Sequence, residues 1–148
     1  MARVPADTTI AARPKARTKP MLKSCVIDPV NGLVSAKFTG ILTLEDIELY
    51  DTQLRAHEEF SPRYSEIVDL TRVEKIAVSG REMMSLRDEI PFFPQSKRAL
   101  VVNNRHQSHA AHLYRIVRKG SNIRVFTSFE DAMEWVDKPC VVAASKAP

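Results

Sequence analysis

The spacing of apolar and polar residues predicts that the folded part of the chain opens with a β-hairpin. Residues 22–28 form one short apolar stretch, and residues 33–39 alternate approximately between apolar and polar side chains, as strands do. Asn31-Gly32 lies between the two stretches and is a typical signal for a turn between antiparallel strands. Gly40 then interrupts the alternation, so we expect the second strand to end there.

Farther along the chain, stretches with helical periodicity alternate with short apolar stretches typical of strands. Thr43 and Ser79 are each followed three positions later by an acid, a capping-box pattern that marks a helix start. Pro91 and Gly120 mark the ends of two helices. The pattern predicts helices over 43–57, 79–90, 106–119 and 128–136, and further strands over 65–70, 98–103 and 123–126.

This order of elements predicts an α/β fold, in which a β-hairpin is followed by alternating helices and strands. Strands that alternate with helices usually pair in parallel through right-handed crossovers. We therefore expect a mostly parallel sheet of about five strands flanked by about four helices. The segment that carries these elements is long enough to bury one hydrophobic core.

The formal net charge of +4 lies entirely in the first twenty residues. The charged residues there are Arg3, Asp7, Arg13, Lys15, Arg17 and Lys19. The rest of the chain carries equal numbers of basic and acidic side chains, so nucleic-acid binding is not expected. We divide the chain into a flexible basic arm (1–20), an α/β domain (21–137) and a flexible tail (138–148). A natural start at Met21 would make the arm an extension.

Several protein classes are excluded by what the sequence lacks. No apolar stretch approaches the ~18–20 residues that span a membrane, and the first twenty residues lack the apolar core of a secretory signal. Cys25 and Cys140 form no CxxC pair, so neither a disulfide framework nor a zinc site is predicted. We expect a cytoplasmic protein without a metal or cofactor.

One segment resembles a known family. Residues 67–73, Ile-Val-Asp-Leu-Thr-Arg-Val, are followed after a short link by Ser79-Gly80 at a predicted helix start. This arrangement resembles the signature of the STAS domain, the family of the SpoIIAA-type anti-sigma factor antagonists. In that family a strand ends in Asn/Asp-Leu-Ser/Thr, and Asp-Ser-Ser/Thr-Gly follows at a helix N-terminus. The element order over residues 22–137 also resembles the family, which implies a STAS/SpoIIAA-like fold.

The resemblance implies a regulatory site. In the family, a partner kinase phosphorylates the serine or threonine before the glycine, and phosphorylation breaks partner binding. Carried over to this sequence, the phosphorylation and partner site comprises Ser79, Gly80, Arg81, Asp69 and Thr71. A phosphate there would meet the positive end of the helix dipole, and Arg81 could pair with it.

The sequence departs from the family's pattern directly before this serine. Ala77 stands where the family usually has Asp, and Val78 stands where it has the first Ser or Thr. A divergent domain that shares the fold without the switch is therefore an alternative. The residues alone also explain Ser79 as a helix N-cap, which stabilises by roughly 0.5–2 kcal/mol relative to alanine.

Two further groups of residues are candidates for ligand binding. Phe92 and Phe93 lie between two prolines, and they either pack into the core or form an exposed apolar lip over a ligand or partner surface. Asn104, Arg105 and His106 lie where a buried strand leads into a helix, a place suited to an anion. The histidines at 106, 109 and 112 have no acid placed to complete a metal site, and we interpret them as a solvated helix face.

Together these observations predict a non-catalytic regulatory or protein-interaction domain, with an anti-sigma or kinase-like protein as its partner. No catalytic constellation was found, because Asp69 lacks a histidine or carboxylate partner in the sequence. The alternative is a carrier or sensor of a small apolar, lipid-like or anionic ligand, because the wider SpoIIAA-like group also resembles the lipid-binding Sec14 lobe. A homodimer through the hairpin or a helix face is left open.

Overall fold

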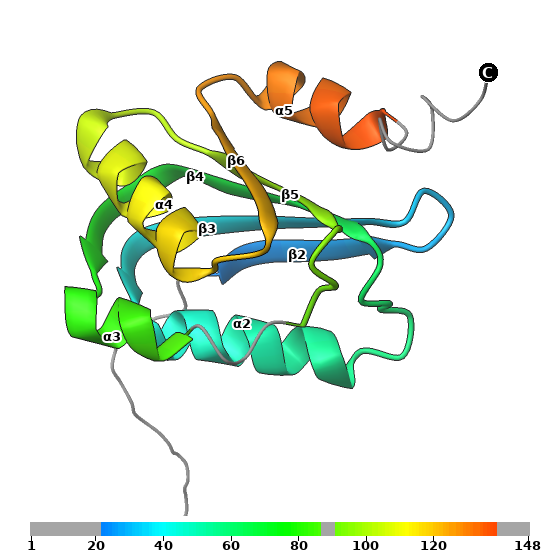
Figure 1. Cartoon of the computed structure of the whole chain (residues 1–148), viewed down its shortest axis with the longest axis horizontal. Coiled ribbons are helices and arrows are strands. Elements are labelled where there is room, and N and C mark those ends of the chain that lie inside the picture. The colour runs from blue at the N-terminus through cyan, green and yellow to red at the C-terminus, as the bar shows by residue number, and fades with distance from the viewer. Residues whose placement is uncertain (1–21, 87–90, 139–148) are drawn as a thin grey trace, which may run out of the picture.

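The computed structural model describes residues 22–86 and 91–138, and they form one sheet with helices on both faces (Figure 1). The strands follow the order β2-β3-β4-β5-β6 in the sheet. β2 and β3 pair antiparallel, and the other neighbouring strands pair in parallel. The elements are β2 (Leu22–Asp28), β3 (Leu33–Thr43), α2 (Leu44–Ala56), β4 (Ser65–Ala77), α3 (Gly80–Ser85), β5 (Lys97–Val101), α4 (Arg105–Val117), β6 (Asn122–Phe126) and α5 (Phe129–Asp137). The predicted fold class is confirmed.

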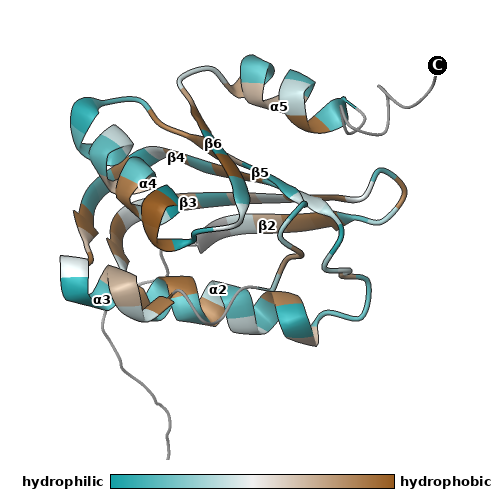
Figure 2. Cartoon of the chain, viewed as in Figure 1, coloured by the Kyte–Doolittle hydropathy of each residue, from teal (hydrophilic) through white to brown (hydrophobic). Residues whose placement is uncertain are grey.

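The helices divide the core into two layers. α2, α3 and α4 lie on one face of the sheet, whereas α5 covers the other (Figure 1). The larger core packs Tyr50, Leu54 and Ala111 of the helices against the strands. Ala132 and Val136 of α5 pack against the opposite face. Hydrophobic and hydrophilic residues alternate along α2 and α4, as expected for helices with one buried side (Figure 2).

The opening hairpin forms where the sequence predicts it. Cys25 pairs with Ala36, and the turn closes between Asp28 and Leu33. The carboxylate of Asp28 accepts hydrogen bonds from the backbone N–H groups of Val30 and Asn31. Gly32 has φ +63°, a conformation that favours glycine.

Two strands are longer than the sequence pattern predicts. β3 continues through Gly40 to Thr43, and β4 continues beyond Leu70 to Ala77. The added halves pair with each other, from Thr39 beside Arg72 onward. The predicted second helix is correspondingly shorter, because α3 ends at Ser85. Positions 87–90 of that prediction lie outside the described residues.

Two bulges in β4 explain why its second half was missed. From Lys37 to Thr39, β3 advances by two residues. Over the same length β4 advances by three residues, from Asp69 to Arg72, so it contains one extra residue. A second register shift follows Gly40. The extra residues bring Leu70, Val73 and Ile76, spaced by three, onto the same buried face. A regular half-buried strand has apolar residues at every second position, so a spacing of three is not recognised as a strand.

Gln107 of α4 binds the part of β4 that β5 does not reach. β5 ends at Val101, opposite Asp69, so the following residues of β4 have no partner in β5. The Gln107 side chain is 1% exposed, and its Nε2 donates to the carbonyl oxygen of Val73 at 2.9 Å. Its Oε1 accepts from the backbone N–H of Asn103 at 2.7 Å. Gln107 therefore fixes the start of α4 on the sheet.

We predict that Gln107→Leu lowers the free energy of unfolding by roughly 2–3 kcal/mol, because it leaves a backbone carbonyl and an N–H group without their partners. Urea denaturation measures the change. Gln53→Leu is the matched control, since Gln53 lies on an exposed position of α2, and it should change stability by less than about 0.5 kcal/mol. Equal effects of the two substitutions would contradict this role of Gln107.

Candidate functional site

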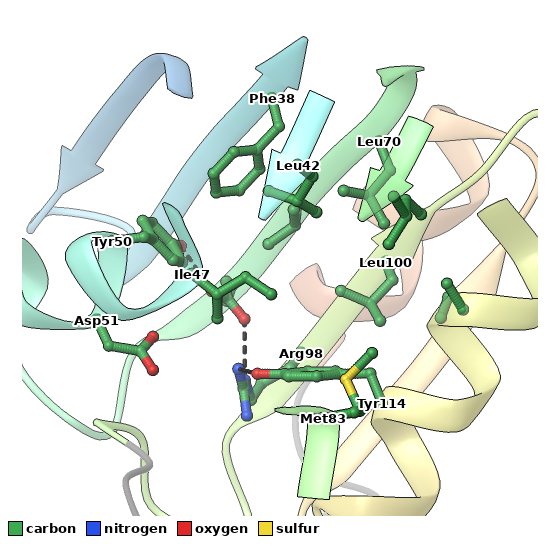
Figure 3. Close-up of a pocket in the computed structure, with 15 residues that line it drawn as sticks. Phe38, Leu42, Ile47, Tyr50, Asp51, Leu70, Met83, Arg98, Leu100 and Tyr114 are labelled. Carbon is green, nitrogen blue, oxygen red and sulfur yellow. Dashed lines mark hydrogen bonds and ion pairs between the residues drawn. The ribbon is translucent and has the colours of Figure 1, made fainter. Parts of the chain in front are cut away.

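A cavity of about 70 Å³ lies between the sheet and helices α2, α3 and α4 (Figure 3). Most of its wall is aliphatic or aromatic, and a group of polar side chains forms the remainder. The lining residues are Phe38, Leu42, Ile47, Tyr50, Asp51, Glu66, Val68, Leu70, Ile76, Met83, Arg98, Leu100, Ala110, Ala111 and Tyr114. A mostly apolar hollow with a few convergent polar groups is typical of a small-molecule site.

Three buried side chains and one half-buried tyrosine, Tyr114, join the sheet to two helices at the polar part of the cavity. We call Tyr50, Glu66, Arg98 and Tyr114 the polar cluster. Nε of Arg98 donates to Oε1 of Glu66 at 2.9 Å, and the Tyr50 hydroxyl donates to Oε2 of Glu66 at 2.6 Å. Nη2 of Arg98 donates to the Tyr114 hydroxyl at 2.8 Å. These bonds connect β4, β5, α2 and α4 in one network.

Arg98 is the centre of this cluster. Its side chain is 2% exposed, and its guanidinium carbon lies 4.9 Å from the ring centroid of Phe92. Burial alone would lower the pKa of Arg98, but Tyr114 and Glu66 outweigh burial and raise the pKa. Within the described part of the chain, the buried Nη1 atom of Arg98 has no hydrogen-bond partner.

A second buried ion pair lies beside the cluster. Nη2 of Arg118, at the end of α4, lies 3.5 Å from Oδ2 of Asp51 on α2. Burial raises the pKa of Asp51 to about 6, although the positive charge of Arg118 acts in the opposite direction. The pair links α2 to α4 independently of the sheet.

The positions of Glu66 and Arg98 follow from strand alternation. Glu66 shares a face with Val68, and Arg98 shares a face with Leu100. The parallel register places Glu66 beside Arg98 on neighbouring strands. No member of the polar cluster is among the site residues predicted from the sequence. The alternation of side chains along β4 and β5 could have identified Glu66 and Arg98. In a strand, a charged residue two positions before a buried apolar residue lies on the same, buried face.

The structure places Ser79 at the exposed start of α3. Its hydroxyl accepts from the backbone N–H of Glu82 at 3.1 Å, and Oε1 of Glu82 accepts from the Ser79 N–H at 3.0 Å. This is the capping box that the sequence predicts. Gly80 and Arg81 are also exposed. These three residues form one surface.

Asp69 and Thr71 lie far from Ser79. Both belong to the middle of β4 rather than to its end, where the sequence analysis placed Asp69. The stretch from Asp69 to Ala77 pairs with six steps of β3, from Lys37 to Thr43, which corresponds to roughly 20 Å. Oδ1 of Asp69 accepts from the backbone N–H and the hydroxyl of Thr71, at 2.9 Å and 2.7 Å. These bonds stabilise the first bulge of β4.

The two phenylalanines between prolines have different environments. Phe92 is 4% exposed and packs edge-on against Phe60, so it belongs to the core. Phe93 is 47% exposed, and its backbone N–H donates to the carbonyl oxygen of Pro62. Neither residue lines the cavity described above. An apolar lip at this position would therefore consist of Phe93 alone.

The predicted anion site lies at the start of α4. Oδ1 of Asn104 accepts from the backbone N–H of Gln107 at 2.9 Å, so Asn104 is the N-cap of this helix. Arg105 and His106 are exposed.

Among the described residues, no group of three or more His, Cys, Asp or Glu side chains is arranged to hold a metal ion. No helix in residues 22–86 and 91–138 is long and apolar enough to span a membrane.

Comparison with known proteins places the fold. No family model and no curated protein matches the sequence. The structure is similar to an anti-sigma factor antagonist from Mycobacterium paratuberculosis, with a TM-score of 0.54 and 14% identity over 78% of this chain and 94% of that one. It is also similar to a DUF3478-family protein with a SpoIIAA-like fold from Shewanella loihica PV-4, with a TM-score of 0.48 and 19% identity over 70% of this chain and 83% of that one. The likeness to the anti-sigma factor antagonist shows that the chain has that protein's fold, as the resemblance of the sequence to the STAS/SpoIIAA-like family implies.

We predict that Tyr50→Phe lowers the free energy of unfolding by roughly 1.5–3 kcal/mol, because it removes a hydrogen bond to the buried carboxylate of Glu66. Urea denaturation at pH 7 measures the change. Tyr64→Phe is the control, since Tyr64 is half-buried outside the polar cluster, and it should cost less than about 1 kcal/mol. A loss no larger than that of Tyr64→Phe would show that the Tyr50 bond does not stabilise the fold.

A second prediction concerns pH. The pKa of Asp51 is about 6 in the folded chain and 3.8 in a free side chain, so the folded state holds its proton more tightly. The protonation of Asp51 adds up to about 3 kcal/mol to the free energy of unfolding. This contribution is fully present below about pH 4 and is lost as pH rises through about 6. The stability of wild type relative to Asp51→Asn should therefore fall between pH 4 and pH 7, measured by urea denaturation. A difference that stays constant with pH would contradict the raised pKa.

Proposed function

We propose that this chain is a non-catalytic regulatory domain that acts by binding a partner protein. The fold supports the proposal, since it is shared with a protein described as an anti-sigma factor antagonist. The partner we propose is an anti-sigma or kinase-like protein, and the contact surface lies at the start of α3. We call the exposed residues Ser79, Gly80, Arg81 and Met84 the α3 surface.

One observation carries this choice of surface: α3 is short, firmly anchored and exposed on its outer side. Met83 and Leu86 are each 3% exposed and pack against α4, where Val117 belongs to the same cluster. The neighbouring Met84 is 46% exposed, beside the exposed Arg81. An apolar side chain next to an arginine, on a fixed backbone, is a combination that protein interfaces favour.

Modification of Ser79 would act on this surface through the capping box. A phosphate on the Ser79 hydroxyl would lie beside the carboxylate of Glu82, which is bonded to the backbone of the same serine. The negative charges of the phosphate and the Glu82 carboxylate would repel each other. Phosphorylation would therefore place a second negative charge beside Glu82 at the start of α3 and change the charge of the surface that the partner contacts.

A second candidate function is a sensor or carrier of a small ligand. The cavity between the sheet and the three helices supports it, because its wall is mainly apolar and contains the buried Arg98. Met83 of α3 lines the same cavity. A bound ligand would thus contact the inner side of the helix that carries the α3 surface.

Substitutions of Ser79 test the protein-binding proposal. The tagged full chain is cross-linked in its host, the captured protein is identified and purified, and its dissociation constant is measured by calorimetry. We expect Ser79→Asp to weaken binding at least tenfold, because it adds a negative charge beside Glu82 while an aspartate still caps α3. We expect Ser79→Ala to bind as wild type does, since it adds no charge.

Ser128→Asp is the matched control for these substitutions. Ser128 caps α5 through the backbone N–H of Asp131, as Ser79 caps α3. The same change there should leave partner binding unaltered. Equal binding by wild type, Ser79→Ala and Ser79→Asp would refute the assignment of the α3 surface. Loss of binding by Ser128→Asp would place the contact at α5 instead.

A further inference from the structure

We propose that the cavity binds a small neutral molecule, mainly apolar, whose alcohol or ketone oxygen accepts a hydrogen bond from Nη1 of Arg98. The inference rests on the second candidate function, the small-ligand sensor or carrier, and names its ligand class. It does not depend on the proposed protein contact at the α3 surface.

The hydrogen bonds of Arg98 leave one of its donor atoms without an acceptor. Its Nε donates to Glu66 and its Nη2 to Tyr114, whereas the buried Nη1 has no partner among the described residues. A buried donor without an acceptor costs free energy, more so when it belongs to a charged group. Oε2 of Glu66 already accepts a hydrogen bond from the Tyr50 hydroxyl. An oxygen of a bound molecule would satisfy Nη1 without disturbing these bonds.

The charges around the cavity favour a neutral ligand. Glu66 is paired with Arg98, and Asp51 is paired with Arg118, so the formal charges of the four buried side chains cancel. A carboxylate or phosphate would add a buried negative charge without a free cation to balance it, which is costly in an apolar environment. A carbonyl or hydroxyl oxygen accepts the same hydrogen bond and adds no charge.

The size of the cavity limits the ligand. An engineered cavity of about 150 Å³ holds benzene, which has six heavy atoms, so by proportion a cavity of 70 Å³ encloses a group of roughly three heavy atoms. The rest of a larger ligand would extend beyond the enclosed space. Leu42, Leu70 and Leu100 are part of its aliphatic wall, and Figure 3 shows them above both Arg98 and Met83. The oxygen of the ligand would lie at Arg98 and its alkyl part against the leucines.

Three probes of similar size and shape test whether the cavity prefers a neutral oxygen, a negative charge or an apolar group. 2-Butanone carries a ketone oxygen, propionate carries a negative charge, and 2-methyl-1-butene replaces the oxygen with a methylene group. Each is titrated into the full isotope-labelled chain, and the methyl signals of Leu42, Leu70, Leu100 and Met83 are followed by NMR. We expect saturable shifts with 2-butanone and at least tenfold weaker binding of the other two, the effect of one hydrogen bond to a charged donor.

Variants show whether the shifts come from the cavity. Arg98→Lys keeps a positive charge beside Glu66 but removes Nη1, and we expect it to bind 2-butanone and 2-methyl-1-butene equally. Ala111→Leu fills the cavity from α4, where Ala111 is 2% exposed, and should abolish binding of all three probes. Ala110→Leu, at a half-buried lining position, serves the same purpose if Ala111→Leu does not fold. Ala56→Leu, on the exposed end of α2, is the control for the added side chain.

The outcomes distinguish the ligand class from the site. If propionate or 2-methyl-1-butene binds as tightly as 2-butanone and Ala111→Leu abolishes this binding, the cavity is a ligand site but the class proposed here is wrong. If 2-butanone binding persists in both Arg98→Lys and Ala111→Leu, the probe binds elsewhere and the inference fails. If none of the probes shifts the methyl signals, the inference and the small-ligand function both fail, while the protein-binding proposal is unaffected.

Discussion

The buried ion pair between Glu66 and Arg98 is the interaction on which the arrangement of helices over the sheet depends. The two side chains project from neighbouring strands into the larger core layer, where most of the surrounding side chains are apolar. Each then binds a tyrosine from a different helix, Tyr50 on α2 and Tyr114 on α4. A buried ion pair adds little net stability compared with well-packed apolar residues, but losing one partner is costly. The network therefore acts mainly by fixing which helix positions face the sheet.

The same constraint accounts for the cavity. A guanidinium and a carboxylate need directed partners, so α2 and α4 are held where the tyrosine hydroxyls reach them. The aliphatic side chains around them cannot then close every gap, and α3 covers the remaining space with Met83. Met83 and Met84 are adjacent in sequence, one buried over the cavity and one exposed on the α3 surface. Occupancy of the cavity and partner binding would thus act on the same short helix from its two sides.

The sequence predicts the elements wherever local signals determine them. The capping boxes at Thr43 and Ser79 and the turn before Leu33 are formed by side chains close in sequence, and all three are present. The second half of β4 was not predicted, because its buried residues are spaced by three after the bulges. The polar cluster was missed for a different reason. Its members come from four elements, and only the register of β4 on β5 brings Glu66 to Arg98.

The Asp-Leu-Thr motif that suggested the family resemblance has a structural explanation in this chain. Asp69 holds the backbone N–H of Thr71, which lies in the first bulge of β4. The bulge turns Leu70 and Val73 to the same buried face and lets β4 continue past the end of β5. That continuation runs alongside β3 toward Ser79, and Ala77 at its end lies roughly 20 Å from Asp69. The motif therefore influences where α3 begins through the path of β4 and without contacting Ser79, so its structural role in this chain does not depend on the side chains of Ala77 and Val78.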